Sequence, residues 1–177
     1  DGIFFKENET FQLGFGHRRL AILELSELGK QPMSWLDLTI VFNGEIYNFA
    51  AIRQQLITLG HTFQAHSDTE TILHAYKEWG TTCLNHFIGM FAFVIYNEAT
   101  HEVFIARDRT GVKPLFIYQT ADLLLFGSEL KAFHQHPRFT KKINTSAAQA
   151  FLQYGYVPTP HCIFEHCFKI EPGKYVQ

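Results

Sequence analysis

The segment from Met90 to Tyr96 most constrains the fold, because it is apolar on both of its faces. Side chains of a strand point alternately to the two faces of a sheet. One face here carries Phe91, Phe93 and Ile95, and the other carries Ala92, Val94 and Tyr96. A strand of this kind must be covered on both sides. The segment therefore predicts stacked sheets with helices as outer layers.

Neighbouring patterns supply antiparallel partners for such sheets. The polar loop from Asn97 to Glu102 leads directly to Val103–Arg107, which predicts a hairpin with the preceding strand. A second hairpin is expected from Pro114–Tyr118 and Leu123–Phe126. Both pairings favour antiparallel sheets.

Helical patterns lie between residues 48 and 80. After Asn48 apolar residues recur at helical spacing, and Gly60 then supplies a stop. Residues 67–70 have the S-x-x-E form of a capping box, and the helix behind them is expected to end at Gly80. We expect a short strand between these helices, from His61 to His66.

Patterns nearer the two ends are less regular. Phe11–Leu25 is predicted to be extended, with an interruption at Gly14–Gly16. A third helix is expected over Ser146–Tyr154, and a segment that contains several prolines follows it.

Composition excludes several classes of function. With 15 basic and 17 acidic residues the net charge is −2, and the basic residues do not cluster, so a nucleic-acid surface is not expected. No apolar stretch approaches the roughly 20 residues of a membrane span, and no signal peptide is expected. Three irregularly spaced cysteines fit a reducing compartment. These observations predict a cytoplasmic protein without a membrane or nucleic-acid partner.

A candidate oxyanion hole lies at Asn43-Gly44-Glu45. The apolar strand Ile40–Phe42 is expected to stop there and give way to a helix. Asn and Gly accept positive φ readily, so a turn of these residues can direct an amide side chain and a backbone N–H to one point. Such donors stabilise the oxyanion of acyl transfer. The alternative is a strand-to-helix turn without chemistry.

Three charged residues could complete a binding site. The guanidinium of Arg19 could hold a carboxylate through two hydrogen bonds, or it could lie on the surface. Asp68, in the first turn of a predicted helix, could hold an ammonium group or only complement the helix dipole. Glu45 could orient a substrate amide or lie in solvent.

Metal and thiol chemistry find less support. The pairs His161-Cys162 and His166-Cys167 lack the ligand spacing of zinc sites, so no metal site is expected. Cys83 precedes an apolar run and is expected to be a buried small hydrophobe. No G-x-S-x-G nucleophile elbow and no glycine-rich phosphate loop occur.

Taken together and in order, the motifs of this chain strongly resemble the class II glutamine amidotransferase domain of asparagine synthetase-like enzymes. The matching runs are Gly16-His17-Arg18-Arg19-Leu20-Ala21-Ile22, Gln31-Pro32-Met33, residues 41–48, His66-Ser67-Asp68-Thr69-Glu70, Gly89-Met90-Phe91-Ala92-Phe93, residues 106–115 and Ser128-Glu129-Leu130-Lys131-Ala132. The resemblance implies an α+β fold, the four-layer αββα sandwich of antiparallel sheets found in N-terminal-nucleophile hydrolases, truncated at the N-terminus.

The same resemblance implies an activity. Enzymes of this family hydrolyse glutamine to glutamate and pass ammonia to a second, ATP-using domain, where asparagine synthetases amidate aspartate. The roles implied for this chain are a grip on the α-carboxylate by Arg19, contacts from Leu20 and the backbone around Ile22, an oxyanion hole of Asn43 and Gly44, contact with the bound amino acid by Glu45, and a grip on the α-ammonium by Asp68. A cation and an anion placed in this way recognise both ends of a free amino acid.

The resemblance also sets the expected domains and partners. Residues 1–177 would form a partial glutaminase domain, and residues 146–177 would lead toward a synthetase domain that this sequence does not contain. We expect no cofactor in the glutaminase domain, and ATP and Mg²⁺ in the synthetase domain. The partners implied are glutamine and that synthetase domain, while a homo-oligomer stays open.

One departure from the family pattern concerns the nucleophile. The family uses a cysteine at the mature N-terminus whose own α-amine acts as the base, whereas this sequence begins Asp1-Gly2-Ile3. The 177-residue polypeptide is therefore expected not to hydrolyse glutamine. Two alternatives stay open, a non-catalytic module that binds glutamine or a protein, and the remnant of a degraded gene. The ammonia acceptor, aspartate or a related carboxylate, is not determined by these residues.

Overall fold

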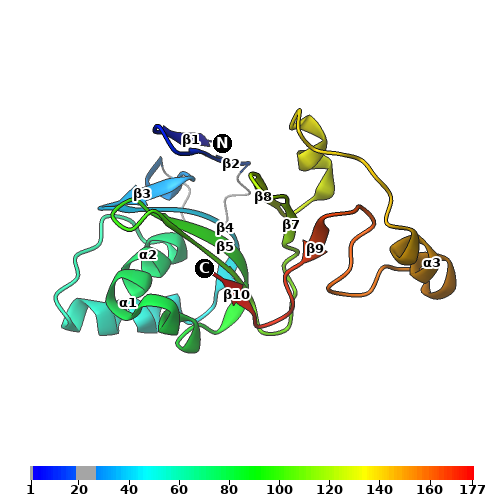
Figure 1. The fold of residues 1–177 in the computed structure, drawn as a ribbon. Helices are drawn as coiled ribbons and strands as arrows, with labels where there is room; N and C mark the ends of the chain where they lie inside the picture. The colour runs from blue at the N-terminus through cyan, green and yellow to red at the C-terminus, as the bar shows by residue number, and fades with distance from the viewer. Residues whose placement is uncertain (1, 19–26) are drawn as a thin grey trace. The chain divides into compact units, whose positions relative to one another are not determined.

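A computed structural model describes residues 2–18 and 27–177 of the chain (Figure 1). The chain forms two compact units. The first contains residues 1–105 and 176–177, and the second contains residues 106–175. No helix in the described ranges is long and apolar enough to cross a membrane.

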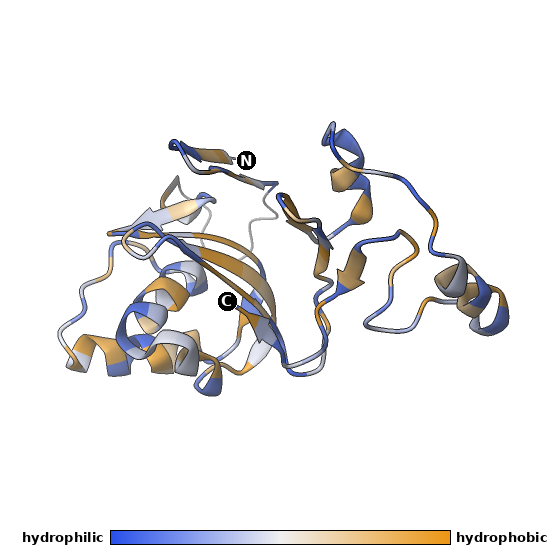
Figure 2. Cartoon of the chain, in the orientation of Figure 1, coloured by the Kyte–Doolittle hydropathy of each residue, from blue (hydrophilic) through white to orange (hydrophobic). Residues whose placement is uncertain are grey.

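The largest sheet is built around two long central strands. Its order is β10-β6-β5-β4-β3. The strands are β3 (Met33–Trp35), β4 (Leu38–Ile46), β5 (Gly89–Asn97), β6 (Glu102–Arg107) and β10 (Tyr175–Val176). β4 and β5 pair antiparallel over nine residues each, and their residues are mostly hydrophobic (Figure 2). The predicted strand at Met90–Tyr96 and its neighbour at Val103–Arg107 are confirmed.

The predicted end of a strand at Phe42 is wrong, because β4 continues through Asn43, Gly44 and Glu45 to Ile46. The partner strand explains the difference. Each of these residues has a registered partner in β5, with Gly44 opposite Phe91. The long pairing with β5 overrides the local turn preference of the Asn-Gly dipeptide.

Two helices, α1 (Phe49–Thr58) and α2 (Asp68–Trp79), cover one face of this sheet (Figure 1). The Tyr76 ring of α2 stacks on Phe104 of β6 at 5.1 Å between centroids, and Phe104 contacts Phe93 of β5 at 5.7 Å. Both helices were expected from the sequence. α2 ends as predicted at Gly80, whose φ is +55°.

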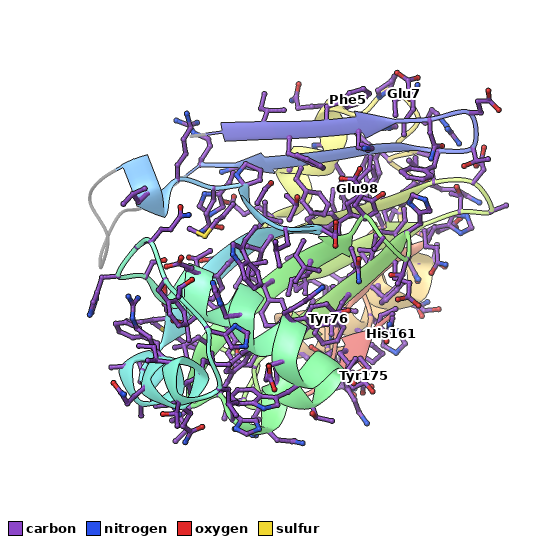
Figure 3. All side chains as sticks on the ribbon, turned by 90° about the vertical axis from the view of Figure 1, so that its left-hand side faces the viewer. Phe5, Glu7, Tyr76, Glu98, His161 and Tyr175 are labelled. Carbon is purple, nitrogen blue, oxygen red and sulfur yellow. The ribbon has the colours of Figure 1, made fainter. Side chains whose placement is uncertain are left out.

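A hairpin of β1 (Gly2–Glu7) and β2 (Gln12–His17) lies over the opposite face (Figure 3). The Phe11 ring contacts Tyr96 at 6.2 Å between centroids, and Lys6 forms an ion pair with Glu98. The expected interruption at Gly14–Gly16 is wrong, because all three residues pair with β1. The remainder of the predicted segment, residues 19–25, lies outside the described residues.

The strand predicted over His61–His66 is also wrong, because side chains satisfy the backbone there instead of a neighbouring strand. Glu70 accepts hydrogen bonds from the N–H groups of Gln64 (2.7 Å) and Ala65 (2.9 Å), and Arg53 donates to the carbonyl of Ala65. Ser67 accepts from the Glu70 N–H at 3.1 Å, which confirms half of the capping box. In a complete capping box the Glu70 carboxylate would accept from the Ser67 N–H. Here it accepts from the N–H groups of Gln64 and Ala65 in the loop before α2.

The second unit contains the second predicted hairpin. It consists of β7 (Phe116–Gln119) and β8 (Leu124–Gly127), and β9 (Cys167–Lys169) adds to β7 antiparallel. α3 (Thr145–Tyr154) confirms the predicted third helix. A short 3-10 helix occupies Leu130–Gln135, and two others, at Glu27–Gly29 and Gly80–Asn85, belong to the first unit. The core of this unit contains Tyr118, Phe133, Phe139, Cys162 and Cys167. Antiparallel sheets with helices make the fold α+β, as predicted.

Candidate functional site

One edge of β4 is only partly covered by a neighbouring strand. β3 pairs with β4 no further than Ile40, and no strand in the described ranges continues along that edge. The alternation of strand backbone directs the N–H groups of Phe42, Gly44 and Ile46 to this same edge, while the residues between them face β5. The bond from the Tyr47 N–H to the Ile88 carbonyl (2.8 Å) continues the alternation on the β5 side.

Buried side chains accept hydrogen bonds from two of these three N–H groups. The Phe42 N–H donates to Gln31 Oε1 at 2.6 Å, and the Ile46 N–H donates to Asp68 Oδ2 at 3.1 Å. Gln31 and Asp68 are each 6% exposed. His17 Nε2 lies 3.0 Å from the Phe42 carbonyl oxygen, within hydrogen-bond distance. In the described part of the chain, three side chains thus take the place of a neighbouring strand on either side of Gly44.

Gly44 lies between the two capped positions. Its φ is +150°, and a Cβ at this position would lie 2.1 Å from the Met90 carbonyl oxygen and 2.7 Å from Phe91 Cα. Only glycine therefore fits this close approach to β5. Among residues 2–18 and 27–177 we find no side-chain acceptor for the Gly44 N–H. This geometry leaves a backbone donor at the edge of the sheet, as an oxyanion hole requires.

Asn43 and Glu45 belong to the face of β4 that the β1–β2 hairpin covers. They share this face with Thr39, because side chains two residues apart along a strand point the same way. Thr39 is registered opposite Tyr96, which contacts Phe11 next to β2. Asn43 and Glu45 are both partly exposed. The Asn43 side chain and the Gly44 N–H therefore leave β4 at consecutive positions.

Asp68 is the first residue of α2, and Ser67 is its N-cap. Burial raises the pKa of the Asp68 carboxyl above its ordinary value, while the hydrogen bond from the Ile46 N–H lowers it and the negative charge of Glu45 raises it further. A cation beside Asp68 would therefore favour the charged carboxylate. The bond to Ile46 shows that Asp68 does more than complement the helix dipole.

The structure brings four of the predicted site residues together, namely Asn43, Gly44, Glu45 and Asp68. Arg19, Leu20 and Ile22 lie outside the described residues. Gln31 and His17 were missed as contacts of β4. Both lie in the quoted motifs, but the sequence holds no signal for the role of Gln31, which is a polar residue that only the fold shows to be buried.

None of the three cysteines is placed as a nucleophile for this edge. Cys83 is fully buried, and burial raises its pKa to about 12. Cys162 and Cys167 are buried in the core of the second unit. The hydrogen bond between their thiols, together with burial, raises the pKa of Cys167. No cluster of three or more potential metal ligands occurs among the described side chains.

Comparison with known proteins places this geometry in a family. Residues 1–177 match the family described as a glutamine amidotransferase domain. Asparagine synthetase [glutamine-hydrolyzing] 3 of Bacillus subtilis is 40% identical, over 90% of this chain and 26% of its own length. Asparagine synthetase [glutamine-hydrolyzing] 1 of the same organism is 39% identical, over 98% of this chain and 27% of its own length. The chain thus spans about a quarter of these relatives.

A solved structure supports the same assignment. Glutamine phosphoribosylpyrophosphate amidotransferase from B. subtilis, complexed with ADP and GMP, superimposes with a TM-score of 0.57 at 30% identity. The likeness covers 67% of this chain and 28% of that one. It confirms the predicted α+β sandwich of N-terminal-nucleophile hydrolases. The chain therefore belongs to the glutamine amidotransferase domain family, as a class II domain of the asparagine synthetase type.

Proposed function

We propose that this chain binds glutamine as the glutaminase part of a glutamine-dependent asparagine synthetase-type amidotransferase. Glutamine would be hydrolysed to glutamate and ammonia, and the ammonia would serve an ATP-dependent amidation of aspartate or a related carboxylate. The observation that supports this proposal most directly is the position of the Gly44 N–H. It lies between the N–H groups of Phe42 and Ile46, which both donate to buried side chains. A donor held at a rigid edge can stabilise an oxyanion without reorganising.

The proposed roles follow from charge and hydrogen-bonding capacity. Asn43 and the Gly44 N–H would donate to the oxyanion formed from the side-chain amide of glutamine. Asp68 would hold the α-ammonium, and Glu45 would contact the bound amino acid. Arg19 would hold the α-carboxylate, with Leu20 and Ile22 beside it. Ion pairs at both ends would select a free amino acid over a peptide-bound one.

The nucleophile is proposed to be none of the three cysteines of this sequence. Cys83 combines full burial with a pKa of about 12, and a thiol attacks only as the thiolate. The hydrogen bond with the Cys167 thiol lowers the pKa of Cys162 to about 6, but Cys162 is 1% exposed, so its sulfur is shielded from solvent. The 177-residue polypeptide by itself should therefore bind glutamine without hydrolysing it.

The amidation step is proposed for the whole parent protein, because this chain spans 26% and 27% of the two relatives described above. ATP and Mg²⁺ would act in the synthetase part of that parent. No cofactor is proposed for the glutaminase part, whose described residues already supply hydrogen-bond donors and a carboxylate.

Two measurements test the proposal. Calorimetric titration of the 177-residue polypeptide should give saturable heat with glutamine and far less with N-acetylglutamine, which lacks the ammonium. The parent protein, given glutamine labelled with ¹⁵N in the side-chain amide, ATP and Mg²⁺, should transfer the label to aspartate or a related acceptor. Absence of both glutamine binding and label transfer would reject the proposed function. Release of glutamate by the polypeptide alone, abolished by Asn43→Ala, would contradict its predicted inactivity.

A further inference from the structure

We propose that Gln31 is a positioning residue, which holds the oxyanion edge of β4 in register with the first turn of α2. This inference rests on the function proposed above. Gln31 is 6% exposed and lies between η1 (Glu27–Gly29) and β3. Its side chain contacts Phe42, which precedes Asn43, and Thr69, which follows Asp68.

The acceptor end of Gln31 is directed to β4. Gln31 Oε1 accepts the hydrogen bond of the Phe42 N–H at 2.6 Å, and Phe42 immediately precedes Asn43. The carbonyl of Phe42 lies 3.0 Å from His17 Nε2. Both polar groups of the Phe42 backbone are thus held by side chains where the sheet has no further strand in the described part of the chain. The direction of the next peptide groups, including the Gly44 N–H, depends on this anchor.

The donor end of Gln31 is directed to α2. Gln31 Nε2 donates to Thr69 Oγ1 at 3.4 Å, and Thr69 immediately follows Asp68. Thr69 is 4% exposed, so this long contact is shielded from water. A glutamine side chain is suited to the position because its amide accepts at one atom and donates at the other without a charge. Glutamate would lack the donor, and lysine would lack the acceptor.

The backbone of Gln31 is itself held by the hairpin. A Cβ on Gly2, the first residue of β1, would lie 2.4 Å from the Gln31 carbonyl oxygen and 3.2 Å from the Pro32 ring. The hairpin therefore packs directly against this residue. Three elements meet at Gln31, and two of them carry the proposed donors and the proposed ammonium-binding carboxylate. Misplacement by about 1 Å at such a site can lower a rate by roughly 100-fold.

Two variants of the full-length parent protein test this role, with activity measured from glutamine and from free ammonia. Gln31→Leu removes both contacts, and Thr69→Val removes only the acceptor on α2. We expect Gln31→Leu to lower the glutamine-dependent rate by about 10- to 100-fold, mainly in kcat, because the oxyanion forms only in the transition state. The ammonia-dependent rate should stay within about twofold. Thr69→Val should cause a smaller loss in the same direction.

A structural control separates positioning from stability. Ile52→Val removes one methyl group from the 2% exposed Ile52 of α1. It should lower the melting temperature while the ratio of glutamine-dependent to ammonia-dependent rates stays unchanged. If Gln31→Leu lowers both rates equally, or neither, the positioning role is overturned. If Thr69→Val changes nothing, the link to α2 is overturned.

A measurement that needs no activity tests the contact itself. Deuterium uptake by the peptide that contains Phe42–Ile46 should be faster in Gln31→Leu than in the wild-type protein and in Ile52→Val. Unchanged uptake would overturn the anchor. If the wild-type protein shows neither glutamine binding nor a glutamine-dependent rate, the proposed function fails, and uptake by this peptide still decides whether Gln31 holds the edge.

Discussion

Asp68 Oδ2 accepts a hydrogen bond from the Ile46 N–H across 3.1 Å, which ties the first residue of α2 to the last residue of β4. The carboxylate is buried, and its pKa is raised by that burial. A buried carboxylate is unfavourable unless it is hydrogen-bonded or paired with a cation. The backbone N–H satisfies part of this need, and the α-ammonium of glutamine would satisfy the rest.

Asp68→Asn should weaken glutamine binding while it preserves the fold. The amide oxygen can still accept from the Ile46 N–H, but the negative charge that attracts the ammonium is lost. Hydrogen bonds to charged groups contribute about 1.5–3 kcal/mol, so the Kd measured by calorimetry should rise by about 10- to 100-fold. Asp37→Asn, at an exposed carboxylate before β4, is the matched control and should leave the Kd unchanged. An unaltered Kd in Asp68→Asn would argue against the ammonium site.

Gly44→Ala should strongly destabilise the first unit. Its Cβ would lie 2.1 Å from the Met90 carbonyl oxygen, and the φ of +150° is unfavourable for alanine. Relief of this overlap requires a shift of β5 and should cost about 2–4 kcal/mol in the free energy of unfolding. Urea denaturation measures this loss. The matched control is Gly14→Ala in β2, where the nearest atom, Phe5 Cδ2, is 3.9 Å away and no large change is expected.

Asn43→Ala should lower turnover more than substrate binding. The amide side chain is proposed to donate to an oxyanion that exists only during the reaction, so its loss should lower the glutaminase kcat of the parent protein by about 10²- to 10³-fold. KM should change much less. Asn97→Ala, at the far end of β5, removes an asparagine whose side chain accepts from the Ala99 N–H, and should leave kcat unchanged. A large rise in KM with normal kcat would reassign Asn43 to ground-state binding.

The sequence predicted helices and hairpins better than it predicted where β4 ends. The apolar spacing of α2 and its cap at Ser67 are local, so the pattern alone located this helix. The continuation of β4 through Asn43 and Gly44 depends on pairing with β5, whose paired residues lie about 50 positions further along the sequence. A local Asn-Gly preference cannot report that contact. The predicted strand at residues 61–66 failed for a similar reason, because the carboxylate of Glu70 takes the place of a strand partner.

For the candidate site too, local chemical signals can be read from the sequence, whereas tertiary contacts cannot. Asp68 and the Asn43-Gly44 pair were proposed as site residues from the sequence, because their chemistry is visible in their type. Gln31 was not assigned a role, because a glutamine in a loop has no chemical signature until the fold buries it beside Phe42 and Thr69. Positioning residues of this kind depend on tertiary contacts, which a single sequence does not show.

His74 gives the first unit a predictable dependence on pH. Its ring is fully buried and stacks on Trp35 and Phe63, at 3.8 Å and 4.2 Å between ring centroids. Its Nδ1 lies 2.9 Å from Nδ1 of His61. Nε2 of His74 has no hydrogen-bond partner among the described residues. Burial, with smaller contributions from His61 and Arg53, lowers the pKa of His74 from 6.5 to about 4.

The sign of the effect follows from these pKa values. Between pH 6.5 and about 4 the unfolded chain binds a proton at His74 and the folded chain does not, so acid favours unfolding. The contribution of His74 is therefore fully present above pH 6.5 and is lost as the pH falls to about 4. At about 1.4 kcal/mol per pKa unit, the loss approaches roughly 3 kcal/mol. Urea denaturation at a series of pH values should show this decline in the free energy of unfolding. His74→Phe removes the titrating group and should flatten the decline, whereas His86→Gln, at an exposed ring, should leave it unchanged. Equal acid sensitivity in the wild-type protein and His74→Phe would assign the decline to other groups.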